Sequence, residues 1–434
     1  MKETRKNLFA ANNKVQAFYP GDPGDRQPVH TVYGGAQLFQ AEVFEKLKRG
    51  AINSLDHFAP SAEALSAALT TGALDRALWT RVYTRVRLKL ETEAVEDYRI
   101  DFEDGYGTRQ DSEEDGHARQ AAQQLLVAGK RGVLPPFIGI RIKPFTNICF
   151  DRSVRTLEIF LKTTGRAIPK SFIVTLPKVQ GVQQIVAFVK CLKDLEKRCG
   201  IKAPIRFEFM VETPQSILDM EGRCPLLEFV QAGEGRCVGA HLGTYDYTAS
   251  HNIVATYQEM LHPACEFAKQ MMKVALSQTG VFLSDGATNV MPVPLHRKES
   301  LSGQEVNENR RAVHSAWKKS YDAIQHSLRT GFFQGWDLHP AQIPIRYAAV
   351  YAFFLDSLTA STNRLKGFVE KAAQATLLGD VFDDAATGQG LLNFFLRGLS
   401  CGALSLDELA QTGLTQDELH TRSFAKILEM RRGK

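Results

Sequence analysis

The 434-residue sequence lacks the signatures of several common protein classes. No stretch of 18 apolar residues occurs, so no transmembrane helix is expected. The first residues, M-K-E-T-R-K-N, are not followed by a hydrophobic segment, so a secretory signal is not expected either. The G-x-x-x-x-G-K-[ST] phosphate loop is also missing, which argues against P-loop nucleotide chemistry.

Cysteine usage and charge argue against further classes. The seven cysteines include no C-x-x-C pair, so neither a zinc nor a thiol redox motif is visible. An odd, dispersed set fits reduced thiols in a cytoplasmic protein, where most would be small buried apolar side chains. The net charge is only +5 and Lys and Arg are scattered, so we expect no nucleic-acid partner. We interpret the small excess of basic residues as a local positive field that attracts an anionic small-molecule substrate.

Eight short runs of strand-forming residues alternate with helical stretches. Several are almost continuously apolar, as in F-I-V-T-L, which is typical of parallel strands buried on both faces. The predicted strands are Val29–Tyr33, Tyr98–Glu103, Phe137–Lys143, Phe172–Leu176, Ile205–Glu212, Arg236–Leu242, Val281–Ser284 and Gly335–His339. This alternation predicts an α/β fold, a (β/α)₈ TIM barrel, with a doubly wound sheet as the alternative.

The remaining segments read mainly as helices. Crossover helices are predicted over Ala118–Ala128, Val182–Arg198 and Asn252–Ser277, and further helices within Leu38–Val86. Pro263 would split or kink the third of these. The chain from about Tyr347 is predicted to form helices that cap the barrel or make an oligomer contact. We therefore expect an N-terminal segment (1–28), a barrel catalytic domain (29–346) and a C-terminal helical extension (347–434).

Polar residues close seven of the eight predicted strands. A charged group at the end of an apolar run costs free energy unless it is paired or binds something. In a (β/α)₈ barrel the catalytic groups stand at these carboxyl ends. The motifs, in chain order, are D-F-E-D-G, R-I-K-P, L-P-K, V-E-T-P-Q-S, H-L-G-T-Y-D-Y, S-D-G and W-D-L-H-P.

Carboxylates within these motifs predict a metal site. Glu212 and Asp246 end successive strands, and two carboxylates with room for water and substrate oxygens suit Mg²⁺. Either could instead pair with Arg141, with Arg206 or with a helix N-terminus. The acidic cluster of Asp101, Glu103 and Asp104 could orient metal-bound water, although Asp104-Gly105 also reads as a turn.

Basic residues in the motifs predict substrate contacts. Arg141 sits inside an apolar strand, where it could hold a carboxylate or stabilise an enolate oxygen, or could form a structural ion pair. Lys178 could anchor a carboxylate or the acidic cluster, and nothing in the sequence favours a Schiff base. His241 and His339 are weaker candidates, since a lone histidine near an apolar strand is more often a hydrogen-bonded core residue.

The ordered motifs resemble a known family. The set D-F-E-D-G, I-R-I-K-P, L-P-K-V, V-E-T-P-Q-S-I, G-T-Y-D-Y and D-L-H-P-A-Q-I, within residues 98–343, resembles the citrate lyase β-subunit-like enzymes, which include malyl-CoA lyases. These enzymes belong to the phosphoenolpyruvate/pyruvate-type barrels. The G-T-Y-D-Y-T-A-S stretch also looks like the metal-site turn of malate synthase, a more distant relative.

The resemblance implies a carbon–carbon lyase or aldolase that depends on Mg²⁺ or Mn²⁺ and acts on a 2-keto or 3-hydroxy acid. By motif it makes Glu212 and Asp246 metal ligands, Arg141 the residue that grips the acid, and Asp101 and Glu103 catalytic. We also expect substrate contacts from Lys178, Gly243, Thr244 and His339. A homo-oligomer is expected on the same ground.

Several points stay open at this stage. A long first connection, the added C-terminal region and the 34-residue gap from Glu212 to Asp246 leave a CoA thioester and a free aldol substrate both possible. The general base could be Asp101, Glu103, Asp285 or a group from a neighbouring subunit. Alternatives are a malate-synthase-like Claisen condensation, phosphoryl or C–P chemistry on phosphoenolpyruvate, and a non-catalytic binding protein.

Overall fold

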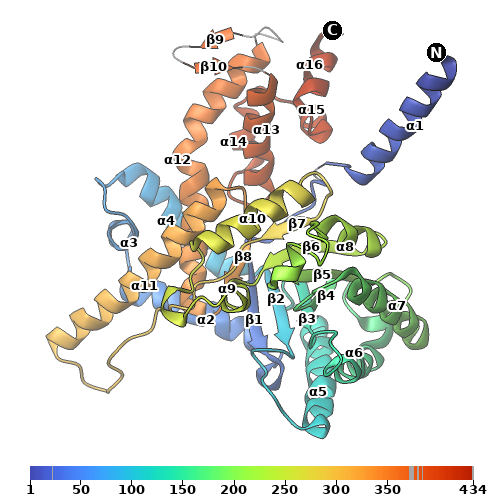
Figure 1. The fold of residues 1–434 in the computed structure, drawn as a ribbon. Helices are drawn as coiled ribbons and strands as arrows, with labels where there is room; N and C mark the ends of the chain where they lie inside the picture. The colour runs from blue at the N-terminus through green and yellow to red at the C-terminus, as the bar shows by residue number, and fades with distance from the viewer. Residues whose placement is uncertain (22, 371–375, 379–380, 384, 433–434) are drawn as a thin grey trace.

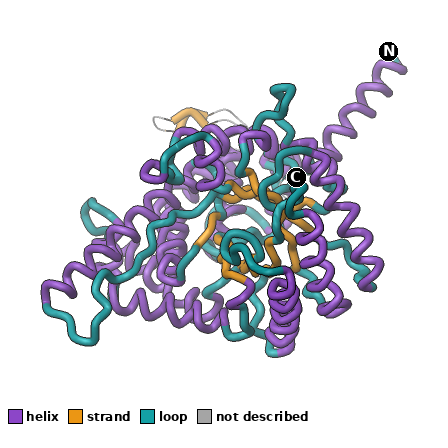
Figure 2. The backbone as a smooth tube through the Cα atoms, turned by 60° about the horizontal axis from the view of Figure 1, so that its bottom comes forward, coloured by secondary structure: helices purple, strands orange, loops and turns teal. Residues whose placement is uncertain are grey.

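The structure is a computed structural model that describes residues 1–21, 23–370, 376–378, 381–383 and 385–432. Eight parallel strands pair in the order β7-β6-β5-β4-β3-β2-β1-β8, and a parallel bridge from Ser284 to Gln334 links the two ends of the sheet. The strands are β1 (His30–Gly35), β2 (Asp97–Asp101), β3 (Phe137–Arg141), β4 (Phe172–Leu176), β5 (Arg206–Val211), β6 (Cys237–Leu242), β7 (Phe282–Ser284) and β8 (Gly335–Asp337). The predicted TIM barrel is confirmed, since neighbouring strands are consecutive and the sheet curls round on itself (Figures 1 and 2).

Helices surround this barrel and extend beyond it. Around the barrel lie α2 (Val43–Phe58), α3 (Ala62–Leu69), α4 (Arg76–Glu93), α5 (Asp111–Lys130), α6 (Phe150–Thr164), α7 (Val182–Cys199), α8 (Leu226–Ala232), α9 (Thr244–Ser250), α10 (Pro263–Leu276) and α11 (Gly303–Arg329). The remaining helices are α1 (Lys2–Phe18), α12 (Ile343–Glu370), α13 (Ala385–Ser400), α14 (Leu406–Ala410), α15 (Gln416–Thr421) and α16 (Phe424–Arg432). Among the described residues, none of these helices is both long and apolar enough to span a bilayer.

Helix α7 illustrates how the sequence pattern becomes structure. Its apolar residues recur at helical spacing, and Phe188, Leu192 and Leu195 are completely buried against the barrel. Each such side chain contributes roughly 1.5–3 kcal/mol on burial. Gln184 caps the first turn, and Gly200 ends the helix in the left-handed conformation that favours glycine.

The predicted helix over Asn252–Ser277 is wrong in its first half. The chain there forms a short 3₁₀ turn at Ala255–Tyr257, and α10 begins only at Pro263. A proline at the first helical position lacks only an N–H group that would have no intrahelical partner, so Pro263 starts the helix instead of kinking it. The His262 ring nitrogen accepts the Ala264 N–H at 3.1 Å and caps this start.

The C-terminal extension lies at the end of the barrel from which the strands start (Figure 1). It is not wholly helical, because Thr376–Leu378 and Val381–Asp383 pair as the antiparallel strands β9 and β10. The run Gly398–Gly402 reads G-L-S-C-G, which matches the spacing of a serine nucleophile motif, but it follows a helix and not a strand. Its Ser400 hydroxyl accepts the Gln27 N–H and donates to the Asp25 carbonyl. The domain division stays a prediction.

The barrel interior contains a buried ionic network. Arg99 reaches across from β2 and donates to both carboxylate oxygens of Glu208 on β5, at 2.8 and 2.9 Å. Glu208 also accepts from Thr175 and bonds to His241, whose other ring nitrogen accepts the Trp336 indole N–H at 3.1 Å. These polar groups are satisfied by one another, which is the condition for burying charge.

A second buried cluster fastens the end of the barrel sheet. The Asp337 carboxylate at the end of β8 accepts from His30 on β1 at 2.8 Å and from Arg346 on α12 at 3.0 Å. The second His30 nitrogen accepts the Glu96 N–H, which makes the first nitrogen the donor. Burial would raise the pKa of Asp337, but Arg346 and His30 outweigh it and hold the pKa at about 2.

We expect Asp337→Asn to lower the free energy of unfolding by roughly 3–5 kcal/mol, because it leaves a buried guanidinium without its counter-charge. Since the folded-state pKa lies below the ordinary value of about 3.9, the ionic part of this stabilisation is complete above that value and is lost as the pH falls towards 2. Urea denaturation at neutral and acid pH measures both effects. Asp322→Asn, at an exposed pair with Lys318, is the control and should change stability by less than about 0.5 kcal/mol. Equal stability of the two variants at neutral pH would contradict the prediction.

Candidate active site

The carboxyl ends of the strands surround a cleft of about 350 Å³. Closing eight parallel strands into a barrel brings these ends to one rim, so residues far apart in the chain meet there. The lining residues are Tyr33, Gly34, Gly35, Asp101, Asp104, Gly105, Arg141, Glu212, Gly243, Thr244, Tyr245, Asp246, Ala287, Trp336 and Leu338. Six of the predicted site residues therefore share one cleft.

Glu212 follows β5 and is almost completely buried. Its Oε1 accepts the backbone N–H of Lys178 at 2.6 Å, whereas its Oε2 has no hydrogen-bond partner among the described residues. Burial raises the pKa of Glu212 to about 8; the Lys178 ammonium opposes this rise and Asp246 adds to it. A buried carboxylate oxygen without a partner is costly unless a cation or a proton occupies it.

Gly243 leaves the room that the Glu212 carboxylate occupies. A Cβ atom added at Gly243 would lie 2.3 Å from Glu212 Oε2 and 2.5 Å from Glu212 Cβ. The next residue, Thr244, has a buried hydroxyl that also lacks a partner among the described residues, and Gly286 leaves the room for it. The missing side chains at Gly243 and Gly286 therefore let the Glu212 carboxylate and the Thr244 hydroxyl lie close against the backbone.

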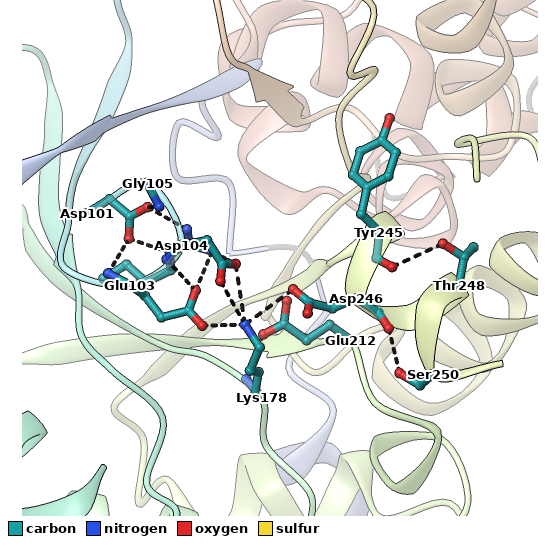
Figure 3. Close-up of polar contacts among 11 residues, drawn as sticks. Asp101, Glu103, Asp104, Gly105, Lys178, Glu212, Tyr245, Asp246, Thr248 and Ser250 are labelled. Atoms are coloured by element: carbon teal, nitrogen blue, oxygen red, sulfur yellow. Dashed lines mark hydrogen bonds and ion pairs between the residues drawn. The ribbon is translucent and has the colours of Figure 1, made fainter. Parts of the chain in front are cut away.

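Asp246 lies in the first turn of α9, directly after this turn. Its side chain is 40% exposed and faces the cleft, and Oδ2 is 3.3 Å from the Lys178 ammonium nitrogen. Figure 3 shows the Asp246 and Glu212 carboxylates next to each other, with the end of Lys178 beside them. The two predicted metal ligands therefore face a common space.

Lys178 stands at the centre of the acidic residues (Figure 3). Its ammonium contacts Glu103, Asp104 at 3.2 Å and Asp246, while its backbone N–H binds Glu212. The backbone adopts φ of 52°, a left-handed conformation that is strained for a residue with a side chain and that clusters at functional sites. Burial would lower the pKa of Lys178, but Glu212, Glu103 and Asp104 raise it above its usual range. Lys178 therefore stays protonated, which disfavours a Schiff base.

Arg141 and Asp101 form a bidentate ion pair. Arg141 Nε and Nη2 donate to the two Asp101 oxygens at 2.7 and 2.5 Å. Asp101 also accepts the backbone N–H groups of Glu103 and Gly105, at 3.0 and 2.8 Å. These four donors occupy both Asp101 oxygens, so Asp101 is better suited to positioning Arg141 than to contacting a substrate hydroxyl group.

Glu103 is buried beside Arg141 and Lys178, next to the cleft residue Asp104, and does not itself line the cleft. Its carboxylate contacts the Lys178 ammonium and accepts the Asp104 N–H at 3.0 Å, and Arg141 Nη1 lies 3.3 Å away. Burial raises the pKa of Glu103 to about 7, although Arg141 and Lys178 lower it. A group with this pKa can hold or release a proton near neutral pH.

Three other candidates lie away from the cleft lining. His339 accepts the Ala341 N–H and caps a 3₁₀ turn, and burial lowers its pKa. His241 belongs to the barrel interior network. Asp285 is buried behind the cleft, where it binds Lys269 at 3.1 Å and Ser327 at 2.6 Å. These contacts give each of the three residues a structural role.

Two aromatic residues of the cleft were missed by sequence reasoning. Tyr33 and Trp336 pack with ring centroids 4.6 Å apart, and the Arg141 guanidinium lies 4.8 Å from the Tyr33 centroid. The Tyr33 hydroxyl is buried and has no partner within the described residues. The available signals were the position of Tyr33 at the end of a predicted strand, before Gly34 and Gly35, and the position of Trp336 in the W-D-L-H-P motif.

The site has an excess of negative charge. Five carboxylates gather there, but among the described residues only two cationic side chains, Arg141 and Lys178, contact them. The five are Asp101, Glu103, Asp104, Glu212 and Asp246. In the described part of the chain, no three His, Cys, Asp or Glu side chains are arranged as a complete metal site. The unpartnered Glu212 oxygen and the Asp246 carboxylate next to it fit a hard divalent cation that takes other ligands from water and substrate.

Comparison with solved structures finds several that are similar to this chain. A citrate lyase from Burkholderia xenovorans is 17% identical, with 89% of this chain and 96% of that chain covered and a TM-score of 0.58. A malate synthase from Haloferax volcanii is 13% identical over 94% and 98% of the chains, with a TM-score of 0.47. A HpcH/Hpal aldolase/citrate lyase family protein from Burkholderia cenocepacia is 10% identical over 78% and 95%, with a TM-score of 0.37. The first match confirms, at the level of the fold, the resemblance to citrate lyase-like barrels.

Curated proteins and protein families complete the comparison. No curated protein matches the chain. One family model matches residues 8–427 and therefore includes the barrel and nearly all of the C-terminal helices. The chain belongs to the family described as Domain of unknown function (DUF6986).

Proposed function

We propose that the protein is a Mg²⁺-dependent carbon–carbon lyase of the aldolase type that acts on a 2-keto or 3-hydroxy acid. The observation behind this proposal is the acidic cleft itself, where five carboxylates face two cations and Glu212 Oε2 is buried without a partner. Such a site gains stability from a bound divalent cation, because the cation offsets the charge excess. The citrate lyase name of a protein with the same fold supports the reaction class.

Glu212 and Asp246 are the residues that would hold the cation. Glu212 follows β5 and Asp246 follows β6, which are neighbouring strands, and Gly243 leaves room for the Glu212 carboxylate. When bound, Mg²⁺ supplies Lewis-acid stabilisation of negative charge that develops on substrate oxygens. Lys178 contacts Asp246 and, through its backbone, Glu212, and so holds both carboxylates in place.

The chain's own polar groups would bind the acid. Asp101 occupies two nitrogens of Arg141 and directs Nη1 towards the acidic edge of the cleft, where it is available to a substrate carboxylate or enolate oxygen. The Thr244 and Tyr33 hydroxyls line the cleft and lack other partners among the described residues, so each can donate to a substrate oxygen. A volume of about 350 Å³ accommodates a small acid, and a CoA thioester would extend out of it.

Cleavage beside a carbonyl also needs a proton to leave a hydroxyl group. Asp101 is saturated by four donors, and Asp285 is paired behind the cleft. Of these candidates for the proton acceptor, Glu103 remains; its pKa is about 7 and the Lys178 ammonium lies next to it. We therefore propose Glu103, supported by Lys178, as the group that holds the proton during turnover.

Loss of a group that only hydrogen-bonds to a metal ligand weakens metal binding by roughly 10- to 100-fold. Glu212→Gln and Asp246→Asn should each weaken Mg²⁺ binding by more than this. The reason is that each change removes a charged oxygen ligand while conserving shape. Isothermal titration of metal-stripped protein with Mg²⁺, with and without oxalate or pyruvate, measures the effect. Glu221→Gln, at an exposed carboxylate away from the cleft, should bind as the unmodified protein does. Full Mg²⁺ affinity in Glu212→Gln would exclude the proposed metal site.

Gly243→Ala should reduce Mg²⁺ affinity and acid binding by roughly 10-fold or more, because its methyl group would displace the Glu212 carboxylate. Circular dichroism should show that the helices and strands persist. Gly116→Ala, on α5, is a matched control, since an added Cβ there meets nothing within 4 Å. Undiminished binding in Gly243→Ala would mean that the cleft does not depend on this space.

A further inference from the structure

A second cavity lies at the end of the barrel opposite the acidic cleft. We call it the basal cavity; its volume is about 1010 Å³. Its lining includes Gln27, Phe282 and Phe333, which stand at or just before the start of β1, β7 and β8. The C-terminal helices form the other side. Catalytic groups of such barrels stand at the opposite rim, so this cavity is separate from the proposed active site.

Basic side chains gather around the basal cavity. Five of its described lining residues are Lys or Arg, and none of the described ones is Asp or Glu. They come from five different elements at or near the ends of α10, α11, α13, α15 and α16: Lys273, Arg329, Arg397, Arg422 and Lys426. Like charges that share one cavity repel each other, and an anion bound among them would remove that repulsion.

Lys273 is the most buried of the lysines that line it. Its ammonium donates to the Gly331 carbonyl and lies 5.0 Å from the Phe332 ring centroid. No salt bridge to Lys273 is found among the described residues. Burial and, to a smaller extent, the positive charge of Arg397 together lower the pKa of Lys273 to about 8. Both effects describe an ammonium whose charge the surrounding protein compensates poorly.

Arg397 is held in place by the segment that precedes β1. Its Nη1 donates to Gln27 Oε1 at 3.1 Å, and its guanidinium lies 5.5 Å from the Phe333 ring centroid. Gln27 in turn donates to the Leu283 carbonyl at the barrel floor. The guanidinium is therefore oriented by both the barrel and the C-terminal helices, which reduces the ordering cost of binding a ligand.

Aromatic side chains form the remaining walls. Phe282, Phe333, Phe353 and Phe394 line the cavity and are only partly covered by protein. Rings in this state offer an apolar surface on which a flat group can pack. A volume at the upper end of the range for small-molecule sites, roughly 300–1,000 Å³, suits a ligand larger than inorganic phosphate.

Helix dipoles explain only part of this arrangement. Lys273, Arg329 and Arg397 lie in the last turns of their helices, where a cation is favourable. Lys426, however, lies in the first turn of α16, where the dipole disfavours a cation. The convergence of all five residues on one cavity therefore calls for a second cause.

We propose that the basal cavity binds a phosphorylated anion that bears an aromatic group, of the chemical class of the nucleoside polyphosphates. The basic residues contact the phosphates, and the phenylalanine walls pack against the base. This site is additional to the proposed catalytic cleft and does not depend on the reaction assigned to it.

The test is isothermal titration of the full-length protein, freed of metal with EDTA, against ATP, pyrophosphate and citrate. We expect ATP to bind more tightly than pyrophosphate or citrate. Lys273→Gln and Lys426→Gln should each weaken ATP binding by roughly tenfold or more, as loss of a charged hydrogen-bond partner does. Lys130→Gln, at an exposed lysine on α5, and Asp246→Asn, in the catalytic cleft, should bind ATP as the unmodified protein does.

Four results would overturn the proposal. They are no heat of binding at millimolar ATP, equal affinity for ATP and pyrophosphate, unchanged ATP affinity in both lysine variants, and loss of ATP binding in Asp246→Asn. The last would place the nucleotide in the acidic cleft. Thermal unfolding is recorded for each variant, and if Lys273→Gln fails to fold, the exposed Lys426→Gln decides the outcome.

Discussion

The bidentate pair between Arg99 and Glu208 is the interaction on which the rest of the barrel depends. It joins β2 and β5 through the middle of the barrel, and both residues are almost completely buried. Burial would raise the pKa of Glu208, but Arg99 and His241 hold it well below its usual range. The two charges can stay buried because hydrogen bonds occupy each Arg99 nitrogen and both Glu208 oxygens.

The hydrogen-bond network around Glu208 also supports the residues of the cleft above it. Glu208 binds His241, His241 accepts from Trp336, and Trp336 packs on Tyr33, whose ring lies under Arg141. The orientation of the residue proposed to bind the acid is thus linked, contact by contact, to the centre of the barrel. Rigid support of this kind is what precise positioning of catalytic groups requires.

The fold and much of the candidate site could be predicted from the sequence because both follow simple rules. Apolar runs buried on both faces predict parallel strands, and a closed barrel then brings Arg141, Glu212 and Asp246 to one rim. Contacts between side chains follow no such rule. The position of Lys178 among three carboxylates depends on its left-handed backbone, and the four donors on Asp101 depend on the turn after β2. Neither of these two backbone features produces a periodic pattern in the sequence.

The features that the sequence analysis predicted wrongly or missed each have a local physical cause. Pro263 was expected to interrupt a helix, but proline is equally suited to a first turn, and only the structure distinguishes the two. The basal cavity could not be predicted, because its residues come from the segment before β1 and from α10 through α16. The two ends of the barrel consequently differ in charge, with acidic side chains at one and basic side chains at the other.

The contacts of the N-terminal strand bear on how the chain folds as it is synthesised. β1 pairs on one side with β8, His30 binds Asp337, and Gln27 binds Arg397 and Ser400. These partners of His30 and Gln27 follow 307 to 373 residues later in the chain, so they leave the ribosome long after β1 does. One edge of β1 and the His30 side chain therefore stay unpaired through most of translation. The barrel sheet can complete its pairing only near the end of synthesis. In a cell, the period in which this protein is open to aggregation or to chaperone binding is set by the length of its own chain.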